Sequence, residues 1–192
     1  MSKIGIYSGS FNPIHFGHIK LAKYLIASKL VDEVWLIVST QNPLKQQNDL
    51  MDDNLRLKMA KIAFKKYPKI KVSDVEFHLP KPSYTIDTLN FLQEKYPQNQ
   101  FFLLIGADNV AVFDKWKNYT EILEKFTVLC YPRENFLQKS EKFPQIKFIN
   151  APRINISSTE IRNRLKNNLP CDDLMPKNVV EFIYQQNPNP TT

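Results

Sequence analysis

The sequence predicts an α/β protein with an open, mostly parallel sheet and helices on both faces. Short apolar runs recur along the chain, and segments with helical spacing lie between most of them. Two runs, Val34–Val38 and Phe101–Ile105, are apolar at every position. Because central parallel strands are buried on both faces, these two runs are expected in the middle of the sheet.

Each expected element follows from a local pattern. Apolar runs bounded by turn residues predict strands at Ile4–Tyr7, Val34–Val38, Ile70–Phe77, Phe101–Ile105, Phe126–Cys130 and Ile146–Ile149. Helical spacing predicts helices at Gly17–Ser28, Asp53–Lys66, Thr85–Lys95, Asn109–Asp114 with Tyr119–Lys125, Ser158–Asn167 and Pro176–Gln185. In such a sheet, ligands bind beyond the carboxyl ends of the strands, so the strand-to-helix junctions are where a site is expected.

Length and composition indicate one globular domain, expected over residues 1–187 with a flexible tail at 188–192. Hydrophobic residues make up 43% of the chain and charged residues 23%, which excludes a largely disordered protein. No apolar run is long enough to cross a membrane and no signal-peptide pattern is present, so a cytoplasmic protein without a membrane partner is expected. Cys130 and Cys171 lie far apart and suggest neither a disulfide nor a zinc site.

A formal net charge of +7 favours anionic partners, and both nucleic acid and polyphosphate fit that charge. The basic residues are spread over several predicted helices, without an array of arginines and aromatic residues. Nucleic acid is therefore not expected as a partner. A basic nucleic-acid-binding module is the alternative from a different functional class, and strongly salt-dependent oligonucleotide binding would distinguish it.

The first predicted strand runs into a turn of small residues that carries two histidines. Gly9 allows the backbone to approach a ligand closely, and free N–H groups at the next helix start favour anions. His15 and His18 are three residues apart and are expected on one face of that helix start. Imidazoles donate hydrogen bonds and can carry charge near neutral pH, which suits a transition state with charged phosphoryl oxygens. Bonds to loop carbonyls or a bound metal are the alternatives.

A second candidate anion site lies near the other end of the chain. Ser157, Ser158 and Thr159 begin a predicted helix, and Arg162 follows within one turn, so hydroxyl and guanidinium donors gather at a helix N-terminus. Ser157 and Glu160 also have the spacing of a capping box, so a plain helix start is the alternative.

Segments in the middle of the chain narrow the choice of expected ligand. Thr85, after Tyr84, is placed to cap a predicted helix or to present N–H groups to a carboxylate. Gly106 and Asp108 follow a central strand, where a carboxylate can accept hydrogen bonds from ribose hydroxyls. Trp116 stands between two lysines and offers a stacking face to an aromatic ring, unless it belongs to the core.

These motifs together resemble a known superfamily. Residues 9–18 read G-S-F-N-P-I-H-F-G-H, similar to the G-x-F-x-P-x-H-x-G-H signature of the nucleotidylyltransferases, and residues 156–162 resemble their I-S-S-T-x-I-R motif. The resemblance implies a Rossmann-like fold and direct attack of a nucleophile on the α-phosphorus of a nucleoside triphosphate, with no covalent intermediate. It implies an ATP site made of Gly9, Ser10, Phe11, His15, His18, Gly106, Asp108, Ser158, Thr159 and Arg162.

The middle segments, P-S-Y-T-x-D-T-L, G-A-D and K-W, are similar to the bacterial nicotinate-nucleotide adenylyltransferase family. The resemblance implies transfer of AMP from ATP to nicotinate mononucleotide, giving deamido-NAD and pyrophosphate in NAD biosynthesis. It implies an acceptor site made of Tyr84, Thr85, Asp108 and Trp116. Nicotinamide mononucleotide and phosphopantetheine are the alternative acceptors, although phosphopantetheine leaves Tyr84, Thr85 and Trp116 without a role.

Two places depart from the family pattern. Ser10 and Asn12 stand where Thr and Asp are common, and Leu44 occupies a histidine position in a loop that ends at Lys45. Lys45 remains a mobile cation for the triphosphate, so the expected catalytic set is His15, His18, Lys45 and Arg162. Mg²⁺ is expected to enter on the ATP phosphates, without protein ligands. The sequence leaves self-association into a homo-oligomer open.

Overall fold

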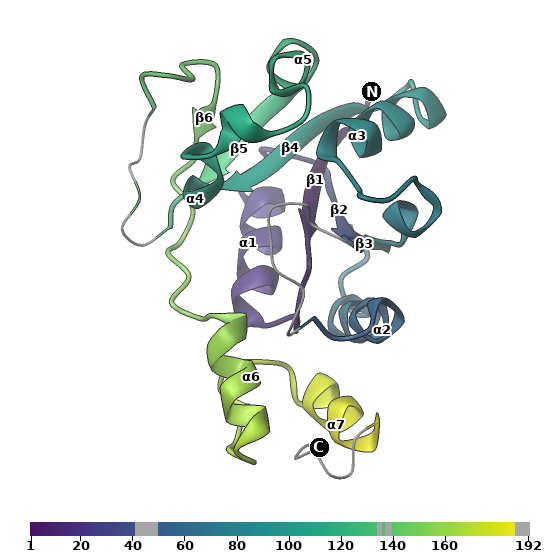
Figure 1. Cartoon of the computed structure of the whole chain (residues 1–192), viewed down its shortest axis with the longest axis vertical. Coiled ribbons are helices and arrows are strands. Elements are labelled where there is room, and N and C mark those ends of the chain that lie inside the picture. The colour runs from purple at the N-terminus through teal and green to yellow at the C-terminus, as the bar shows by residue number, and fades with distance from the viewer. Residues whose placement is uncertain (41–49, 134–135, 137–139, 187–192) are drawn as a thin grey trace.

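A single sheet organises the structure, a computed structural model that describes residues 1–40, 50–133, 136 and 140–186. Its strands are β1 (Lys3–Gly9), β2 (Glu33–Val38), β3 (Ile70–Ser73), β4 (Gln100–Gly106), β5 (Thr127–Tyr131) and β6 (Lys147–Phe148). Their order is β3-β2-β1-β4-β5-β6, and all five neighbouring pairs are parallel (Figure 1). The α/β class is confirmed, and β2 and β4 flank β1 in mid-sheet as predicted.

Helices and short 3₁₀ turns connect the strands. The helices are α1 (Phe16–Ala27), α2 (Asp53–Phe64), α3 (Thr85–Lys95), α4 (Ala107–Val110), α5 (Tyr119–Lys125), α6 (Ser158–Lys166) and α7 (Lys177–Gln186). The 3₁₀ turns are η1 (Val75–His78) and η2 (Phe113–Lys115). Within the described ranges, no helix is both long and apolar enough to cross a bilayer.

Two predicted elements are wrong in extent. The strand expected over Ile70–Phe77 ends at Ser73, because the Val75 N–H donates to Ser73 Oγ at 3.2 Å and the chain turns into η1. The helix expected over Asn109–Asp114 is replaced by α4 and η2. Phe113 is fully buried there, so packing of this ring takes precedence over continuing the helix.

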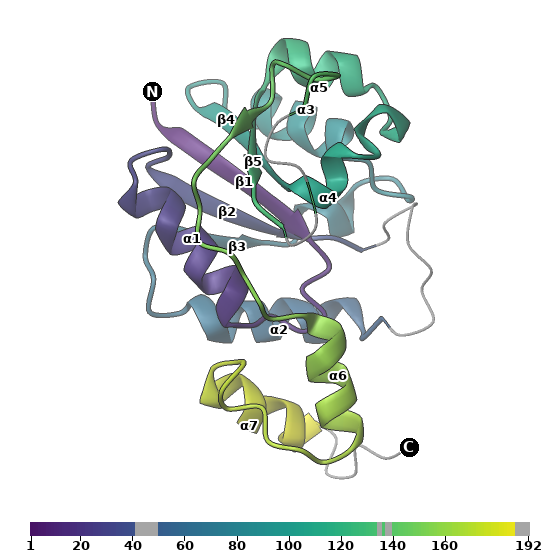
Figure 2. The ribbon, with the colours of Figure 1, turned by 90° about the vertical axis from the view of Figure 1, so that its left-hand side faces the viewer.

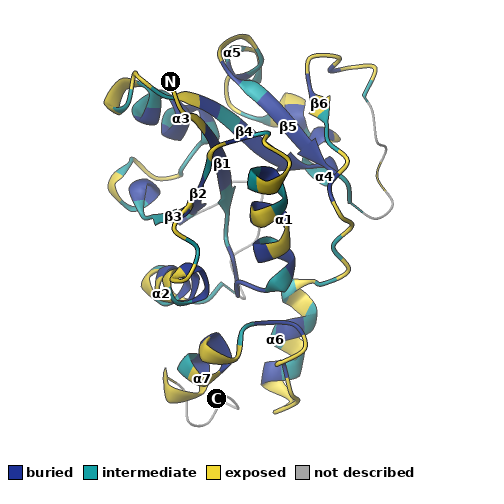
Figure 3. Cartoon of the chain, turned by 180° about the vertical axis from the view of Figure 1, so that it is seen from behind, coloured by how far each residue is buried: buried dark blue, intermediate teal, exposed yellow. Residues whose placement is uncertain are grey.

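Each face of the sheet has its own core. Helices α1 and α2 lie on one face, with α6 and α7 beyond them adding to the same core, and α3, α4 and α5 lie on the other face (Figure 2). Neighbouring residues of β4 alternate between them: Leu104 joins the first core, and Leu103 and Ile105 join the second. Figure 3 shows exposed stripes on the outer sides of the helices and buried central strands. Because helices cover both faces of the sheet, the edge formed by the carboxyl ends of the strands is where a ligand can bind.

Candidate active site

A cleft of about 850 Å³ opens beyond the carboxyl ends of β1, β2, β4 and β5. This is the edge at which the strand-order rule places ligands, next to the switch point between β1 and β4. The structure brings these predicted site residues together in its lining: Gly9, Ser10, Phe11, His15, His18, Tyr84, Thr85, Gly106, Asp108, Trp116, Ser158, Thr159 and Arg162. Leu44 and Lys45 lie outside the described residues.

Two sides of this cleft are formed by different parts of the chain. We call the loop Gly9–His18 and the start of α6 the loop wall. We call Tyr84–Thr85 and Lys115–Lys117 the aromatic wall. Both contribute to the cleft lining, although their segments lie far apart along the chain.

The two histidines of the loop wall are stacked, with ring centroids 3.7 Å apart. His15 Nδ1 accepts a hydrogen bond from the Gly17 N–H at 3.1 Å, and His18 Nδ1 accepts one from the His15 N–H at 3.2 Å. A neutral imidazole carries one N–H, so these bonds assign the proton of each ring to Nε2. The histidines therefore bond to backbone N–H groups at the start of α1, not to loop carbonyls, and each keeps one donor.

Burial determines the protonation of these rings. It lowers the pKa of His15 to about 3, helped by the nearby Arg133 cation. Burial also holds the pKa of His18 well below its usual value, with His15 and Arg133 contributing. The charge that imidazoles can carry near neutral pH is therefore disfavoured here, because His15 is only 3% exposed and charging it would need desolvation of an ion. Both rings act as neutral donors.

Gly17 shows why this wall needs a residue without a side chain. A Cβ on Gly17 would lie 2.2 Å from Ile154 Cγ2 and 2.9 Å from the His15 ring. The close approach at Gly17 is therefore to other protein atoms. Gly17 allows the segment before α6 to pack on the start of α1.

The two end motifs meet directly, 145 or more residues apart in sequence. Ser158 Oγ donates to the Pro13 carbonyl at 3.1 Å, and Arg162 Nη1 donates to the Asn12 carbonyl at 2.9 Å. Ser157 Oγ accepts from the Glu160 N–H at 3.1 Å, so the capping interpretation also holds for Ser157. The start of α6 therefore has two structural tasks: Ser157 caps the helix, and the following side chains hold the loop wall.

The aromatic wall is more open. Trp116 is half-buried, with its ring 5.1 Å from that of Phe113, so it combines a core contact with a place in the cleft. Lys117 joins the two segments of the wall: its ammonium lies 4.7 Å from the Tyr84 ring centroid and 2.9 Å from the Asp87 carboxylate. Thr85 is the first residue of α3, after Tyr84 at the N-cap, so its expected capping role is wrong.

Arg133 is a cleft residue that the sequence did not single out. Its Nε lies 3.5 Å from Asp108 Oδ1, and its Nη2 donates to the Tyr131 hydroxyl at 3.0 Å. Within the described part of the chain, Arg133 Nε and Asp108 Oδ1 are buried and have no hydrogen-bond partner. Each therefore keeps bonding capacity at the cleft. Arg133 lies just beyond β5, where the strand-end rule directs attention.

Glu76 is the second such residue, hidden within a predicted strand. It is 3% exposed, lines the cleft and accepts hydrogen bonds from Ser8 Oγ at 3.1 Å and Thr88 Oγ1 at 3.2 Å. Burial raises the pKa of its carboxyl to about 7, although both hydroxyl bonds and the Arg56 cation act in the opposite direction. Glu76 thus connects the end of β1 to α3.

Taken together, the fold and the cleft define a class of protein. A parallel sheet of order 3-2-1-4-5-6, with donors at a strand-to-helix loop and a carboxylate after β4, is the architecture of a nucleotide-binding α/β protein.

Comparison with known proteins narrows this class. The cytidylyltransferase-like family model matches residues 6–164. A "probable nicotinate-nucleotide adenylyltransferase" of Flavobacterium johnsoniae is 45% identical over 190 residues, covering 96% of this chain and 97% of its own length. The protein of the same name from Bacteroides fragilis is 46% identical, covering 96% and 92%. The chain therefore belongs to the cytidylyltransferase-like family and, within it, to the nicotinate-nucleotide adenylyltransferases.

A solved structure supports the fold. Nicotinic acid mononucleotide adenylyltransferase of Plasmodium falciparum, complexed with NaAD, superposes with a TM-score of 0.81, covering 97% of both chains. The identity is 21%, so this likeness concerns the Rossmann-like fold alone.

Proposed function

We propose that this chain transfers the adenylyl group of ATP to nicotinate mononucleotide, giving deamido-NAD and pyrophosphate in NAD biosynthesis. The observation that carries the proposal is that both walls line the same cleft. The loop wall offers hydrogen-bond donors to phosphate oxygens, and the aromatic wall offers Tyr84 and Trp116 to the pyridine ring. The names of relatives aligned over 96% of the chain support the same reaction. We place this reaction in the cytoplasm.

The reaction needs positioning and charge stabilisation more than proton transfer. An ionised phosphate oxygen of nicotinate mononucleotide attacks the α-phosphorus in line, and a new O–P bond forms. The bond from the α-phosphorus to the oxygen bridging the β-phosphate breaks, and pyrophosphate leaves with that electron pair. We assign His18 to the α-phosphate through its Nε2–H, and His15, Lys45 and Arg162 to the β- and γ-phosphates.

Mg²⁺ is proposed to arrive on the ATP phosphates. Among the described lining residues, the carboxylates are those of Asp108, which lies 3.5 Å from Arg133 Nε, and Glu76, which accepts hydrogen bonds from two hydroxyls. No group of three His, Cys, Asp or Glu side chains among the described residues is arranged to hold a metal. This donor set fits an ion coordinated by phosphate and water oxygens, which would offset charge on the triphosphate.

The charge of the aromatic wall supports an acid acceptor over an amide. Lys115 and Lys117 flank Trp116, and all three line the cleft. Asp87 partly balances the charge of Lys117. A carboxylate on the pyridine ring gains from the remaining positive charge, whereas a neutral carboxamide gains little.

The deciding experiment measures pyrophosphate release from Mg-ATP with three acceptors offered separately: nicotinate mononucleotide, nicotinamide mononucleotide and phosphopantetheine. We expect the fastest release with nicotinate mononucleotide and background release without an acceptor. Equal rates with the nicotinamide form would remove the acid preference. No release with any acceptor, together with salt-dependent oligonucleotide binding, would favour the nucleic-acid-binding alternative.

A further inference from the structure

The largest fully buried side chain outside the cleft lining is an arginine. Arg56 lies in the first turn of α2 and has no exposed surface. A guanidinium stays charged in proteins and is costly to bury unless its N–H groups are bonded. The contacts that compensate Arg56 therefore show what its burial achieves.

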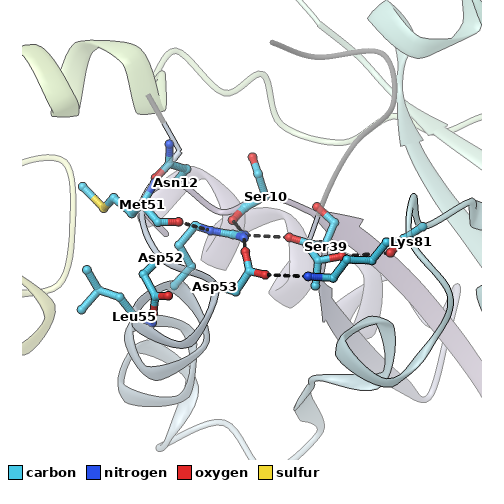
Figure 4. Close-up of polar contacts among 11 residues, drawn as sticks. Ser10, Asn12, Ser39, Met51, Asp52, Asp53, Leu55 and Lys81 are labelled. Atoms are coloured by element: carbon cyan, nitrogen blue, oxygen red, sulfur yellow. Dashed lines mark hydrogen bonds and ion pairs between the residues drawn. The ribbon is translucent and has the colours of Figure 1, made fainter. Parts of the chain in front are cut away.

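Arg56 donates to three backbone carbonyls from three segments. Its Nη1 donates to the Ser10 carbonyl at 2.6 Å and to the Ser39 carbonyl at 2.8 Å, and its Nε donates to the Met51 carbonyl at 3.0 Å. Its Nη2 pairs with Asp53 Oδ1. Figure 4 shows Ser10, Ser39 and the segment Met51–Asp53 converging. Lys81 Nζ lies 3.9 Å from Asp53 Oδ2. One side chain thus joins the ends of β1 and β2 to α2.

Two of these carbonyls belong to residues that line the cleft. Ser10 and Ser39 both line it, whereas Arg56 does not. Ser10 precedes Phe11, whose φ of 44° is in the left-handed region, so the turn depends on outside contacts to keep its shape. An apolar side chain at position 56 would leave three carbonyls in the protein interior without this donor. Burial of the guanidinium is explained by support of the loop wall.

Met51, whose carbonyl accepts from Arg56, is also held from the loop side. Asn12 Oδ1 accepts a hydrogen bond from the Met51 N–H at 3.1 Å, and the Asn12 carbonyl accepts from Arg162 Nη1. Asn12, which departs from the family pattern, thus connects α6 through the loop to the segment before α2. An amide oxygen is sufficient for this bond, so no carboxylate is needed for it.

We propose that Arg56 is a positioning residue for the triphosphate site: through the Ser10 carbonyl, and through Ser39, whose N–H donates to the Gly9 carbonyl at 2.9 Å, it holds the loop wall in the geometry that binds ATP. This inference rests on the proposed function, because the assignment of the triphosphate to the loop wall comes from it. Arg56 acts through the backbone and touches neither substrate.

The test compares Arg56→Lys with Arg164→Lys. Lysine keeps the charge but replaces the planar fork with a single nitrogen, which cannot reach three carbonyls and a carboxylate at once. Arg164, in α6, also bonds a carbonyl and two carboxylates, those of Pro170, Asp173 and Glu160, outside the cleft lining. We expect the Kd for Mg-ATP, measured by calorimetry without acceptor, to rise about tenfold in Arg56→Lys and less than twofold in Arg164→Lys.

Steady-state kinetics separates positioning from simple loss of stability. In Arg56→Lys we expect the KM for Mg-ATP to rise and the KM for nicotinate mononucleotide to stay within about twofold of wild type. A second variant, Asp53→Asn, changes the partly exposed carboxylate that pairs with Arg56. We expect it to raise the KM for Mg-ATP by a smaller factor than Arg56→Lys. A folded Arg56→Lys protein with wild-type affinity for Mg-ATP would overturn the proposal, as would an equal loss in Arg164→Lys. Failure of the proposed function would give a different result: the wild-type protein would bind Mg-ATP but release no pyrophosphate.

Discussion

The two walls of the cleft are built in different ways. Residues 11–15 of the loop wall are buried, and the loop is held by hydrogen bonds from α2 and α6, so Ser10, Asn12 and Pro13 each have a carbonyl bound by a distant side chain. The aromatic wall is partly exposed, and its two segments are joined by Lys117 and Asp87, whose side chains are 43% and 39% exposed.

This difference predicts different sensitivities. Exposed ion pairs contribute about 0.2–1 kcal/mol, whereas leaving buried carbonyls unpaired costs more. We therefore expect the loop wall to determine the rate of the chemical step and to tolerate little change. The aromatic wall is expected to determine affinity for the acceptor and to tolerate more.

The largest effect is expected from His18→Ala. Loss of one donor to the transition state should lower kcat about 100-fold to 1000-fold. Assays of pyrophosphate release at saturating ATP and nicotinate mononucleotide measure kcat. His78 is exposed, so His78→Ala is the control that should keep the wild-type kcat. Near-normal turnover by a folded His18→Ala protein would remove the assignment of His18.

Gly17→Ala tests how tightly the loop wall is packed. The new Cβ would lie 2.2 Å from Ile154 Cγ2, so the segment before α6 must shift, at a cost of up to about 3 kcal/mol in the free energy of unfolding. Urea denaturation measures the loss. Gly5→Ala is the matched control, since its Cβ would lie 3.3 Å from Val31 Cγ2, and equal losses in both would contradict the tight packing of this wall.

Glu76→Gln tests the connection between the end of β1 and α3 beside the cleft. Glutamine can still accept from Ser8 and Thr88 but does not titrate. In wild type the folded pKa of about 7 exceeds the usual 4.5, so the folded state binds more protons and this stability is lost as pH rises from about 4.5 through 7.

The variant should therefore gain stability relative to wild type on going from pH 5 to pH 8, by on the order of 2 kcal/mol. Chemical denaturation of both proteins at each pH measures this difference. His15 and His18 are present in both proteins, so their contribution to the pH dependence cancels. A difference that stays constant over this range would show that Glu76 is ionised throughout.

Trp116→Ala is expected to have the smallest effect and to change only the acceptor. Loss of the stacking face should raise the KM for nicotinate mononucleotide about tenfold, or about 1.4 kcal/mol, and leave the KM for ATP unchanged. Trp116→Phe keeps a ring and should lie close to wild type. An equal rise in both KM values would contradict the claim that the aromatic wall determines affinity for the acceptor alone.

Several elements were predictable because their signals are local. α3 begins and ends at Thr85 and Lys95 as predicted, and both end motifs lie at strand-to-helix junctions on one edge. Arg56 was not predictable in the same way. It stands in α2 among basic neighbours such as Lys58 and Lys61, and nothing in the local pattern distinguishes it from them. Its burial depends on Ser10 and Ser39, which other segments bring to it.

The sequence by itself determined the mostly parallel sheet, the alternation of its strands and helices and the places of the two end motifs, because apolar periodicity and turn chemistry depend on neighbouring residues. The tertiary structure alone decided that His15 and His18 are neutral, that Gly17 packs against Ile154, and that Asn12 bridges to Met51. These properties arise from burial and contact between segments far apart in the chain, and no local pattern encodes the desolvation that controls them.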